Sequence, residues 1–115
     1  MVNFDLNNRV AVVTGGAQGF GFSITERFLD SGAKVIVWDV DKKAIEEASK
    51  KISSEKCSYQ LVDVTNFEDI NKNIENITKE KNIDIFVNNA GIAGKNAKVW
   101  DYPNDEWLKV INLDL

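Results

Sequence analysis

The chain has 115 residues, which is the size of one domain. Apolar residues make up 43% of it and charged residues 28%, a balance typical of globular proteins rather than disordered or fibrous ones. Its 18 acidic and 14 basic side chains give a net charge of −4, so we expect neither nucleic acid nor an anionic membrane as a partner. No apolar run approaches the roughly 18 residues of a membrane span, and the first nine residues lack the apolar segment of a secretory signal.

Two residue types narrow the chemistry further. The chain has no histidine, which excludes His-based acid–base catalysis and His-ligated metal sites within it, and we expect no metal site. The single cysteine, Cys57, excludes an intrachain disulfide and favours a reducing compartment, the cytoplasm. Cys57 has two interpretations: a small, partly buried side chain beside an apolar run, which we favour, or a reactive thiol.

Short β-branched runs alternate with longer segments of helical period along the chain. Strands are predicted over residues 9–14, 34–38, 58–62 and 83–87. Helices are predicted over residues 19–30, closed by Gly32, from Asp39 or Asp41 to about Ser53, and after a Thr65–Glu68 capping box. A last amphipathic helix is predicted, with Asn104 as its N-cap and Leu108, Ile111 and Leu115 on one face.

This alternation predicts an α/β fold, a doubly wound parallel sheet of strand order 3-2-1-4 with right-handed crossovers. The chain stops at Leu115, inside the last predicted helix. We therefore expect residues 1–115 to be one domain that is incomplete at its C-terminus. Such a piece would have an open edge at its fourth strand and an uncovered apolar face, so we expect it to be marginally stable or self-associating when isolated.

A glycine-rich turn joins the first predicted strand to the first predicted helix. Its sequence, TGGAQGFG from Thr14 to Gly21, has the spacing T-G-x-x-x-G-x-G. Gly15 permits a tight turn, Gly19 a close approach of the backbone to a pyrophosphate, and Gly21 close packing of the helix. The helix N-terminus then offers free amides and a partial positive charge to phosphates. The pattern favours dinucleotide binding over a glycine-rich turn that binds nothing.

Two aspartates follow the next two predicted strands. Asp39, 18 residues beyond Gly21, is suited to accept hydrogen bonds from both hydroxyls of an adenosine ribose and to repel a 2′-phosphate, which favours NAD over NADP. Its alternative role is a plain helix cap. Asp63 could accept a hydrogen bond from the adenine amino group, with Val64 beside the ring. From the residues alone, a turn aspartate is an equal interpretation of Asp63.

Two asparagines and two small residues, Asn88-Asn89-Ala90-Gly91, follow the fourth predicted strand. Asparagine side chains can tie neighbouring strand ends together, and small residues suit a place where backbone and ligand come close. An ordinary Asn-rich turn remains an equal alternative at this stage.

Taken together, the segments TGGAQGFG, WDV, LVDVT, IDIFVNNAG and VINLDL resemble the short-chain dehydrogenases/reductases. They occur in the family's order and at its spacing over essentially the whole chain. The resemblance implies a Rossmann-like fold and a nicotinamide cofactor. It also implies an enzyme that transfers a hydride between that cofactor and a carbonyl or alcohol carbon. A 3-oxoacyl thioester, a sugar or a polyol are the small-molecule substrates it suggests, and the intact enzyme is expected to be a homo-oligomer.

The resemblance also assigns roles to residues. It places the cofactor phosphates on residues 15–20, where Gly15, Gln18, Gly19 and Phe20 would contact them. It places the adenosine ribose on Asp39, the adenine on Asp63 and Val64, and the nicotinamide-side ribose on Asn89, Ala90 and Gly91. Asn112 matches a catalytic asparagine that anchors water in a proton relay. Without the resemblance, Asn112 is a polar residue on an amphipathic helix.

One departure from the family pattern matters. The family's Tyr-x-x-x-Lys pair is absent, because Tyr59 is followed four residues later by Asp63 and Tyr102 by Glu106. The family's members are roughly twice as long as this chain. The chain is therefore expected to be the amino-terminal cofactor-binding half of an enzyme and to be inactive alone. Two alternatives are a dinucleotide-binding module without chemistry and a structural subunit with a relict fold.

Overall fold

The computed structural model describes residues 5–89 and 111–112 of the chain. The strands are β1 (Val10–Thr14), β2 (Lys34–Asp39), β3 (Cys57–Leu61), β4 (Ile85–Asn88) and the two-residue β5 (Ile111–Asn112). The helices are α1 (Gly19–Asp30), α2 (Lys42–Lys51) and α3 (Phe67–Thr78). The predicted alternation of strands and helices is confirmed through β4. The predicted ends differ from the observed ones by at most two residues, except that Asp39, one of the two starts given for α2, lies three residues before it.

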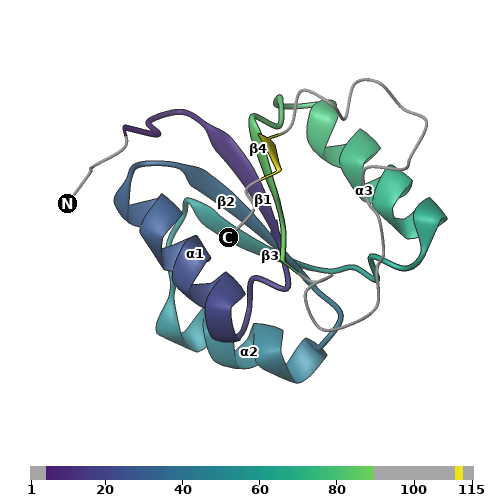
Figure 1. Cartoon of the computed structure of the whole chain (residues 1–115), viewed down its shortest axis with the longest axis horizontal. Helices are drawn as coiled ribbons and strands as arrows, with labels where there is room; N and C mark the ends of the chain where they lie inside the picture. The colour runs from purple at the N-terminus through teal and green to yellow at the C-terminus, as the bar shows by residue number, and fades with distance from the viewer. Residues whose placement is uncertain (1–4, 90–110, 113–115) are drawn as a thin grey trace.

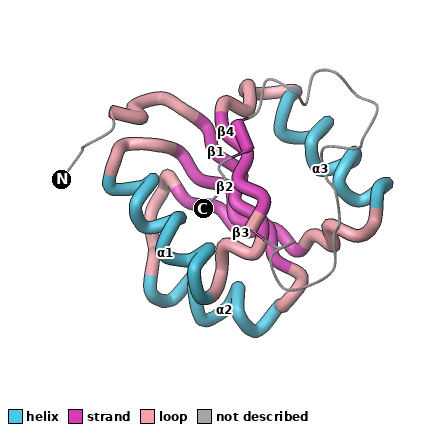
Figure 2. Tube along the Cα trace, in the orientation of Figure 1, coloured by secondary structure: helices cyan, strands magenta, loops and turns pink. Residues whose placement is uncertain are grey.

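The strands form one parallel sheet in the order β3-β2-β1-β4-β5. Helices α1 and α2 lie on one face of this sheet and α3 lies on the other (Figures 1 and 2). This is the doubly wound, Rossmann-like arrangement that the sequence predicts, with the predicted order 3-2-1-4 intact.

The strand β5 corrects two predictions. Ile111 and Asn112 were expected on an amphipathic helix, whereas the structure pairs them in parallel with Ile85 and Phe86 of β4. The edge of β4 was expected to be open, and β5 covers it at these two positions. The physical reason is that a free edge has unpaired backbone donors and acceptors, which a strand satisfies and a helix does not. Asn104, Leu108 and Leu115 of the predicted helix lie outside the described residues.

The helix ends follow from identifiable local residues. Asp41 caps α2 by accepting a hydrogen bond from the Ala44 amide at 3.1 Å. Asn66 caps α3, so the predicted capping box beginning at Thr65 is wrong by one residue. Gly32 has a φ of 96°, and a left-handed residue of this kind ends α1 as predicted.

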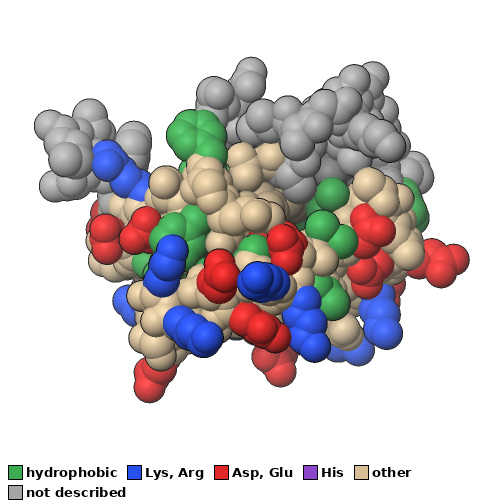
Figure 3. Space-filling model, turned by 90° about the horizontal axis from the view of Figure 1, so that it is seen from below, with side chains coloured by type: hydrophobic (Ala, Val, Ile, Leu, Met, Phe, Trp, Pro, Cys, Tyr) green, Lys and Arg blue, Asp and Glu red, His purple; other side chains and the backbone are tan. Residues whose placement is uncertain are grey.

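Charged side chains of both signs are interspersed over the face of the molecule that Figure 3 shows, and no single-sign patch covers it. This mixture fits the small net charge of the chain and offers no extended basic surface on that face. Within residues 5–89 and 111–112, every helix is too short or too polar to cross a bilayer.

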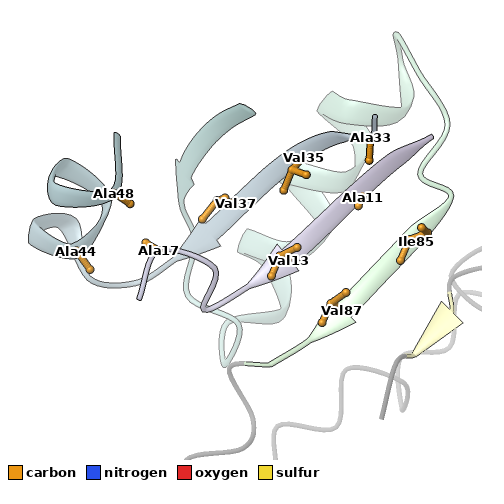
Figure 4. Close-up of a cluster of buried hydrophobic side chains, with 10 residues drawn as sticks. All are labelled: Ala11, Val13, Ala17, Ala33, Val35, Val37, Ala44, Ala48, Ile85 and Val87. Atoms are coloured by element: carbon orange, nitrogen blue, oxygen red, sulfur yellow. The ribbon is translucent and has the colours of Figure 1, made fainter. Parts of the chain in front are cut away.

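Two apolar clusters hold the sheet between its helices. On the face of α1 and α2, small and β-branched side chains pack together (Figure 4); they are Ala11, Val13, Ala17, Ala33, Val35, Val37, Ala44, Ala48, Ile85 and Val87. On the face of α3, Trp38 is fully buried and its ring meets that of Phe86 edge-on at 5.6 Å. All five residues of β1 are buried, as expected of a central strand covered on both faces.

Candidate functional site

The predicted site residues follow the carboxyl ends of four parallel strands. The glycine-rich turn follows β1, Asp39 ends β2, Asp63 follows β3, and Asn88 ends β4. Because β1 to β4 are all parallel, these ends lie at one edge of the sheet (Figure 1). In open sheets of this kind, ligands bind at that edge.

The glycine-rich turn is held by the neighbouring strand. Gly15 has a φ of 63°, and its amide donates to the Trp38 carbonyl at 2.6 Å. Gly19 has a φ of 56°, and a Cβ at this position would meet no atom within 4 Å among the described residues. Gly19 is therefore required by backbone conformation and borders open space, which leaves its backbone accessible.

Gly21 is required for a different reason, namely close packing. A Cβ on Gly21 would overlap the Gly15 carbonyl oxygen and lie 2.6 Å from the Asn89 Nδ2 atom. The Thr25 hydroxyl lies 3.2 Å from the Gly16 carbonyl and 3.0 Å from the Gly21 carbonyl. The start of α1 is thus packed tightly against its own turn and against the end of β4.

The N-terminus of α1 lacks the side-chain cap that α2 and α3 have. Its N-cap residue, Gln18, makes no capping hydrogen bond, and the first turn of α1 has no acidic residue. Within the described part of the chain, the amides of Gly19 and Phe20 donate to no acceptor. These amides and the positive end of the helix dipole face the sheet edge without a compensating anion, which is the condition for binding phosphate.

Asp39 is buried, with 4% of its surface exposed, and it joins two segments of backbone. Its Oδ2 atom accepts a hydrogen bond from the Ala17 amide at 3.2 Å, and its Oδ1 atom accepts one from the Asp41 amide at 3.0 Å. Asp39 is therefore not the cap of α2, a role that Asp41 performs. A carboxylate oxygen can accept two hydrogen bonds and each Asp39 oxygen accepts one from the described residues, so both retain capacity for a ligand hydroxyl.

Asp63 lies half-buried in the loop between β3 and α3. Its Oδ1 atom accepts hydrogen bonds from the Thr65 amide at 2.9 Å and the Thr65 hydroxyl at 2.6 Å. These two bonds stabilise the charged form and lower the pKa of Asp63 below its ordinary value. The neighbouring Val64 packs against the cluster on the α3 face of the sheet.

The asparagines after β4 are tied to the end of β1. The Asn89 amide donates to the Thr14 hydroxyl oxygen at 2.9 Å, and the Asn89 side chain donates to the Gly15 carbonyl at 3.3 Å. The Thr14 hydroxyl lies 3.2 Å from the Val87 carbonyl and 3.4 Å from the Asn88 Oδ1 atom. These bonds fix the β4 end against the glycine-rich turn, the role in joining strand ends that the sequence suggested.

A hollow of about 380 Å³ opens between α1 and α2 next to the glycine-rich turn. It is lined by Ala17, Gln18, Gly19, Phe22, Asp41, Lys43, Ala44, Glu47, Ala48 and Lys51. Its two lysines are matched by two carboxylates, and the Lys51 ammonium lies 5.7 Å from the centre of the Phe22 ring. The hollow therefore has no excess of positive charge among its lining residues.

Cys57 is not placed as a reactive thiol. Its side chain is half-buried, and burial raises the pKa of the thiol, so the nucleophilic thiolate is disfavoured. The Tyr59 hydroxyl is directed at the Ala48 and Ile52 carbonyls, at 3.4 and 3.1 Å. Burial, with a smaller contribution from the neighbouring Cys57, also raises the pKa of Tyr59, so this phenol stays protonated and is not a proton-exchanging group.

Most of the predicted site residues come together at the sheet edge. The turn residues Gly15, Gln18, Gly19 and Phe20 lie there with Asp39, Asp63, Val64 and Asn89. Ala90 and Gly91 lie outside the described residues. Asn112 lies in β5 opposite Phe86, two residues before β4 ends. In the described part of the chain, no group of Cys, Asp or Glu side chains could hold a metal ion.

Two residues that organise the site were not predicted for it. Thr14 joins the ends of β1 and β4, and Thr65 holds the Asp63 carboxylate. The spacing Asp63-Val64-Thr65 could have revealed the second, because an aspartate often accepts a hydrogen bond from the residue two positions later in a turn. Thr14 opens the T-G-x-x-x-G-x-G pattern, but the pattern does not reveal its role, because its partners are about 75 residues away in the chain.

Comparison with known proteins places the chain among dehydrogenases. The family model described as short chain dehydrogenase matches residues 9–115. The chain is 38% identical over 114 residues to the 3-oxoacyl-[acyl-carrier-protein] reductase FabG of Chlamydia trachomatis, covering 96% of this chain and 46% of that protein. It is 35% identical over 114 residues to the NAD-dependent glycerol dehydrogenase of Listeria innocua, covering 98% and 44%.

A probable NADP-dependent mannitol dehydrogenase of Yarrowia lipolytica is 38% identical over 120 residues, covering all of this chain and 43% of that protein. Among solved structures, a glucose/ribitol dehydrogenase of the same family from Brucella melitensis superposes with a TM-score of 0.68 at 27% identity, over 75% of this chain and 37% of that one. The chain thus spans less than half the length of these relatives.

Proposed function

We propose, since the chain belongs to the short-chain dehydrogenase family, that it is the NAD-binding portion of an enzyme that transfers a hydride between the cofactor and a carbonyl or alcohol substrate. The single observation that supports this best is the arrangement at the start of α1. Uncapped amides there lie beside a glycine-rich turn that the Asp39 carboxylate holds. Phosphate and ribose recognition therefore occupy adjoining positions.

The residues that would hold the cofactor fit the group they would bind. The Ala17 amide is already used by Asp39, so the pyrophosphate would be bound by the amides of Gly19 and Phe20 and by the helix dipole. Gln18, Gly15 and the rest of the turn would shape this contact. Asp39 would accept hydrogen bonds from the adenosine ribose, because both its oxygens retain capacity for them.

The remaining proposed contacts lie further along the sheet edge. Asp63 would accept from the adenine amino group, with Val64 beside the ring, and Asn89, Ala90 and Gly91 would line the nicotinamide-side ribose. When bound, the nicotinamide supplies the chemistry of hydride transfer. The protein would supply orientation, which the Thr14 and Asn89 hydrogen bonds favour by fixing the end of β4.

The choice of NAD over NADP rests on charge. A 2′-phosphate on the adenosine ribose would lie against the buried Asp39 carboxylate, and the adjoining hollow has as many carboxylates as lysines. Relatives with either cofactor in their names are similar to this chain, so family membership alone does not decide the matter.

The substrate class and a proton relay are also part of the proposal. The names of the relatives favour a 3-oxoacyl thioester, a sugar or a polyol. Asn112, which lies in β5, would anchor the water of that relay, as the family resemblance implies. We also propose that the intact enzyme is a homo-oligomer and that its substrate is a small molecule.

Calorimetric titration with NAD and with NADP tests the proposal directly. We expect NAD to bind at least tenfold more tightly than NADP, because one unscreened like-charge contact costs about 1.4 kcal/mol or more. Asp39→Asn should reduce this preference. Asp30→Asn, which removes an exposed carboxylate at the far end of α1, should leave it unchanged. Binding of neither nucleotide would overturn the proposal.

A further inference from the structure

The Asp63 carboxylate has two unequal oxygens. Its Oδ1 atom accepts both hydrogen bonds from Thr65, at 2.9 and 2.6 Å. Its Oδ2 atom accepts none from the described residues. Thr65 therefore fixes the plane of the Asp63 carboxylate as well as stabilising its charge, and it leaves the second oxygen without a hydrogen bond from the described residues.

The backbone of Asp63 is held as firmly as its side chain. Its amide donates to the Asp69 Oδ2 atom at 3.0 Å, across the start of α3. Asp69 is itself held, because its other oxygen accepts from the Asn73 side chain at 3.2 Å and its amide donates to Asn66. With the backbone fixed in this way, the remaining freedom of Asp63 is rotation of its side chain, which the Thr65 amide and hydroxyl restrict together.

The bond from the Thr65 hydroxyl is additional to the bond that closes the turn. The Thr65 amide already closes the turn onto Oδ1. The Thr65 side chain is exposed and packs into no core cluster, so its hydroxyl contributes orientation rather than burial. The shorter of the two bonds is the one from the hydroxyl.

The charge of Asp63 determines what its free oxygen can recognise. The two Thr65 bonds lower the pKa of the Asp63 carboxyl, so at neutral pH the group is ionised and only accepts hydrogen bonds. An exocyclic amine would donate to it. A carbonyl oxygen in the same place would be repelled, because two hydrogen-bond acceptors would then face each other with no hydrogen between them. Leaving both acceptors unsatisfied costs free energy of binding.

We propose that Thr65 is a positioning residue that turns the free oxygen of Asp63 toward the adenine amino group, so that the site selects adenine over hypoxanthine. This inference rests on the proposed function, because it assumes that the nucleotide binds at this sheet edge. It adds a residue outside the glycine-rich turn and the aspartates, and it assigns that residue to base selection rather than to affinity for the phosphates.

The test compares NAD with nicotinamide hypoxanthine dinucleotide, which has a carbonyl oxygen in place of the adenine amine. Both dissociation constants are measured by calorimetry on the wild-type protein and on variants. We expect the wild type to prefer NAD about tenfold, the contribution of one hydrogen bond to a charged partner. Thr65→Val should lower the preference to about twofold, and Thr65→Ser should restore it.

Two further variants complete the design. Thr78→Val makes the same substitution at the end of α3, where the hydroxyl bonds only to backbone carbonyls of its own helix, and should leave the preference unchanged. Thr65→Ala gives the same comparison as Thr65→Val without a β-branched side chain in the loop. Thermal melts of each variant show whether it is folded.

The outcomes separate this inference from the proposed function. A folded Thr65→Val or Thr65→Ala variant with the full wild-type preference overturns the positioning role, as does loss of the preference in Thr65→Ser. A wild type that binds both dinucleotides equally overturns the adenine contact of Asp63 while the phosphate and ribose contacts stand. A wild type that binds neither overturns the proposed function and this inference together.

Discussion

The N-termini of α1 and α3 present the same backbone groups, but the side chains around them differ. The Asn66 side chain caps α3 by accepting a hydrogen bond from the Asp69 amide at 3.2 Å. Glu68 and Asp69, in the first turn of α3, place negative charge at the positive end of the helix dipole. At α1 the side-chain cap and the acids are both missing, and glycines take their place. The difference shows that the first turn of α3 is capped and balanced by its own residues, whereas the described residues leave the start of α1 without a side-chain cap or an acid.

Gly21→Ala should have the largest effect on stability, because it disrupts the close packing at the start of α1. The new methyl group would overlap the Gly15 carbonyl and crowd Asn89. We expect a loss of about 2–3 kcal/mol in the free energy of unfolding, measured by urea denaturation. Gly19→Ala is the matched control, since its methyl group meets open space and costs only about 1 kcal/mol of left-handed strain. Equal losses for the two variants would contradict the packing argument.

Gln18→Asp should convert the start of α1 into one like that of α3. The new carboxylate can cap the helix, so we expect stability to be unchanged or to rise by about 0.5–1 kcal/mol. The same charge would compete with the pyrophosphate, so NAD affinity should fall about tenfold in a calorimetric titration. Gln18→Asn, a cap without the charge, is the control and should lose much less affinity. An unchanged affinity in Gln18→Asp would show that no anion binds there.

Asn66→Ala should show the converse at α3. Removing this cap leaves the Asp69 amide without its acceptor, and we expect a loss of about 1 kcal/mol in stability. The affinity for NAD phosphates should not change, because this helix end is not where we propose that they bind. Parallel thermal melts and titrations check both parts. A loss of affinity as large as that in Gln18→Asp would remove the distinction between the two helix ends.

The smallest effect concerns pH. Since the pKa of Asp63 is lower in the folded protein than in the unfolded chain, its ionised form stabilises the fold above the unfolded value of about 4. This contribution is lost as the pH falls through the folded pKa. Thr65→Val raises the folded pKa toward the unfolded one, so its urea midpoint should decline less between pH 6 and pH 3 than that of the wild type. Parallel curves for the two proteins would contradict the assigned cause.

The sequence predicted the fold well where local signals and tertiary packing agree. The all-apolar run before Thr14 could only be a central strand, and Gly32 marked the end of α1 correctly. It failed at Ile111 and Asn112, because their spacing from other apolar residues is helical while their actual partners are Ile85 and Phe86. A pairing over some 26 residues leaves no mark in the local pattern.

The sequence predicted where the candidate site residues lie in the fold, but not the hydrogen bonds that they make. The positions of Gly15, Asp39 and Asp63 follow from their spacing after strands, and the structure brings them to one edge. That Asp39 accepts from the Ala17 amide could not be foreseen, because the bond spans 22 residues and depends on how β1 and β2 align. The sequence therefore indicates which residues meet, whereas their orientation follows only from the fold.

The double engagement of Asp39 bears on any attempt to redesign this protein for a phosphorylated cofactor. Shortening this side chain to admit a 2′-phosphate would also release the Ala17 and Asp41 amides, so the glycine-rich turn and the start of α2 would lose the acceptor that they share. A successful redesign must supply a new acceptor for both amides along with the new cation, and single substitutions at this position should trade selectivity against rigidity of the turn.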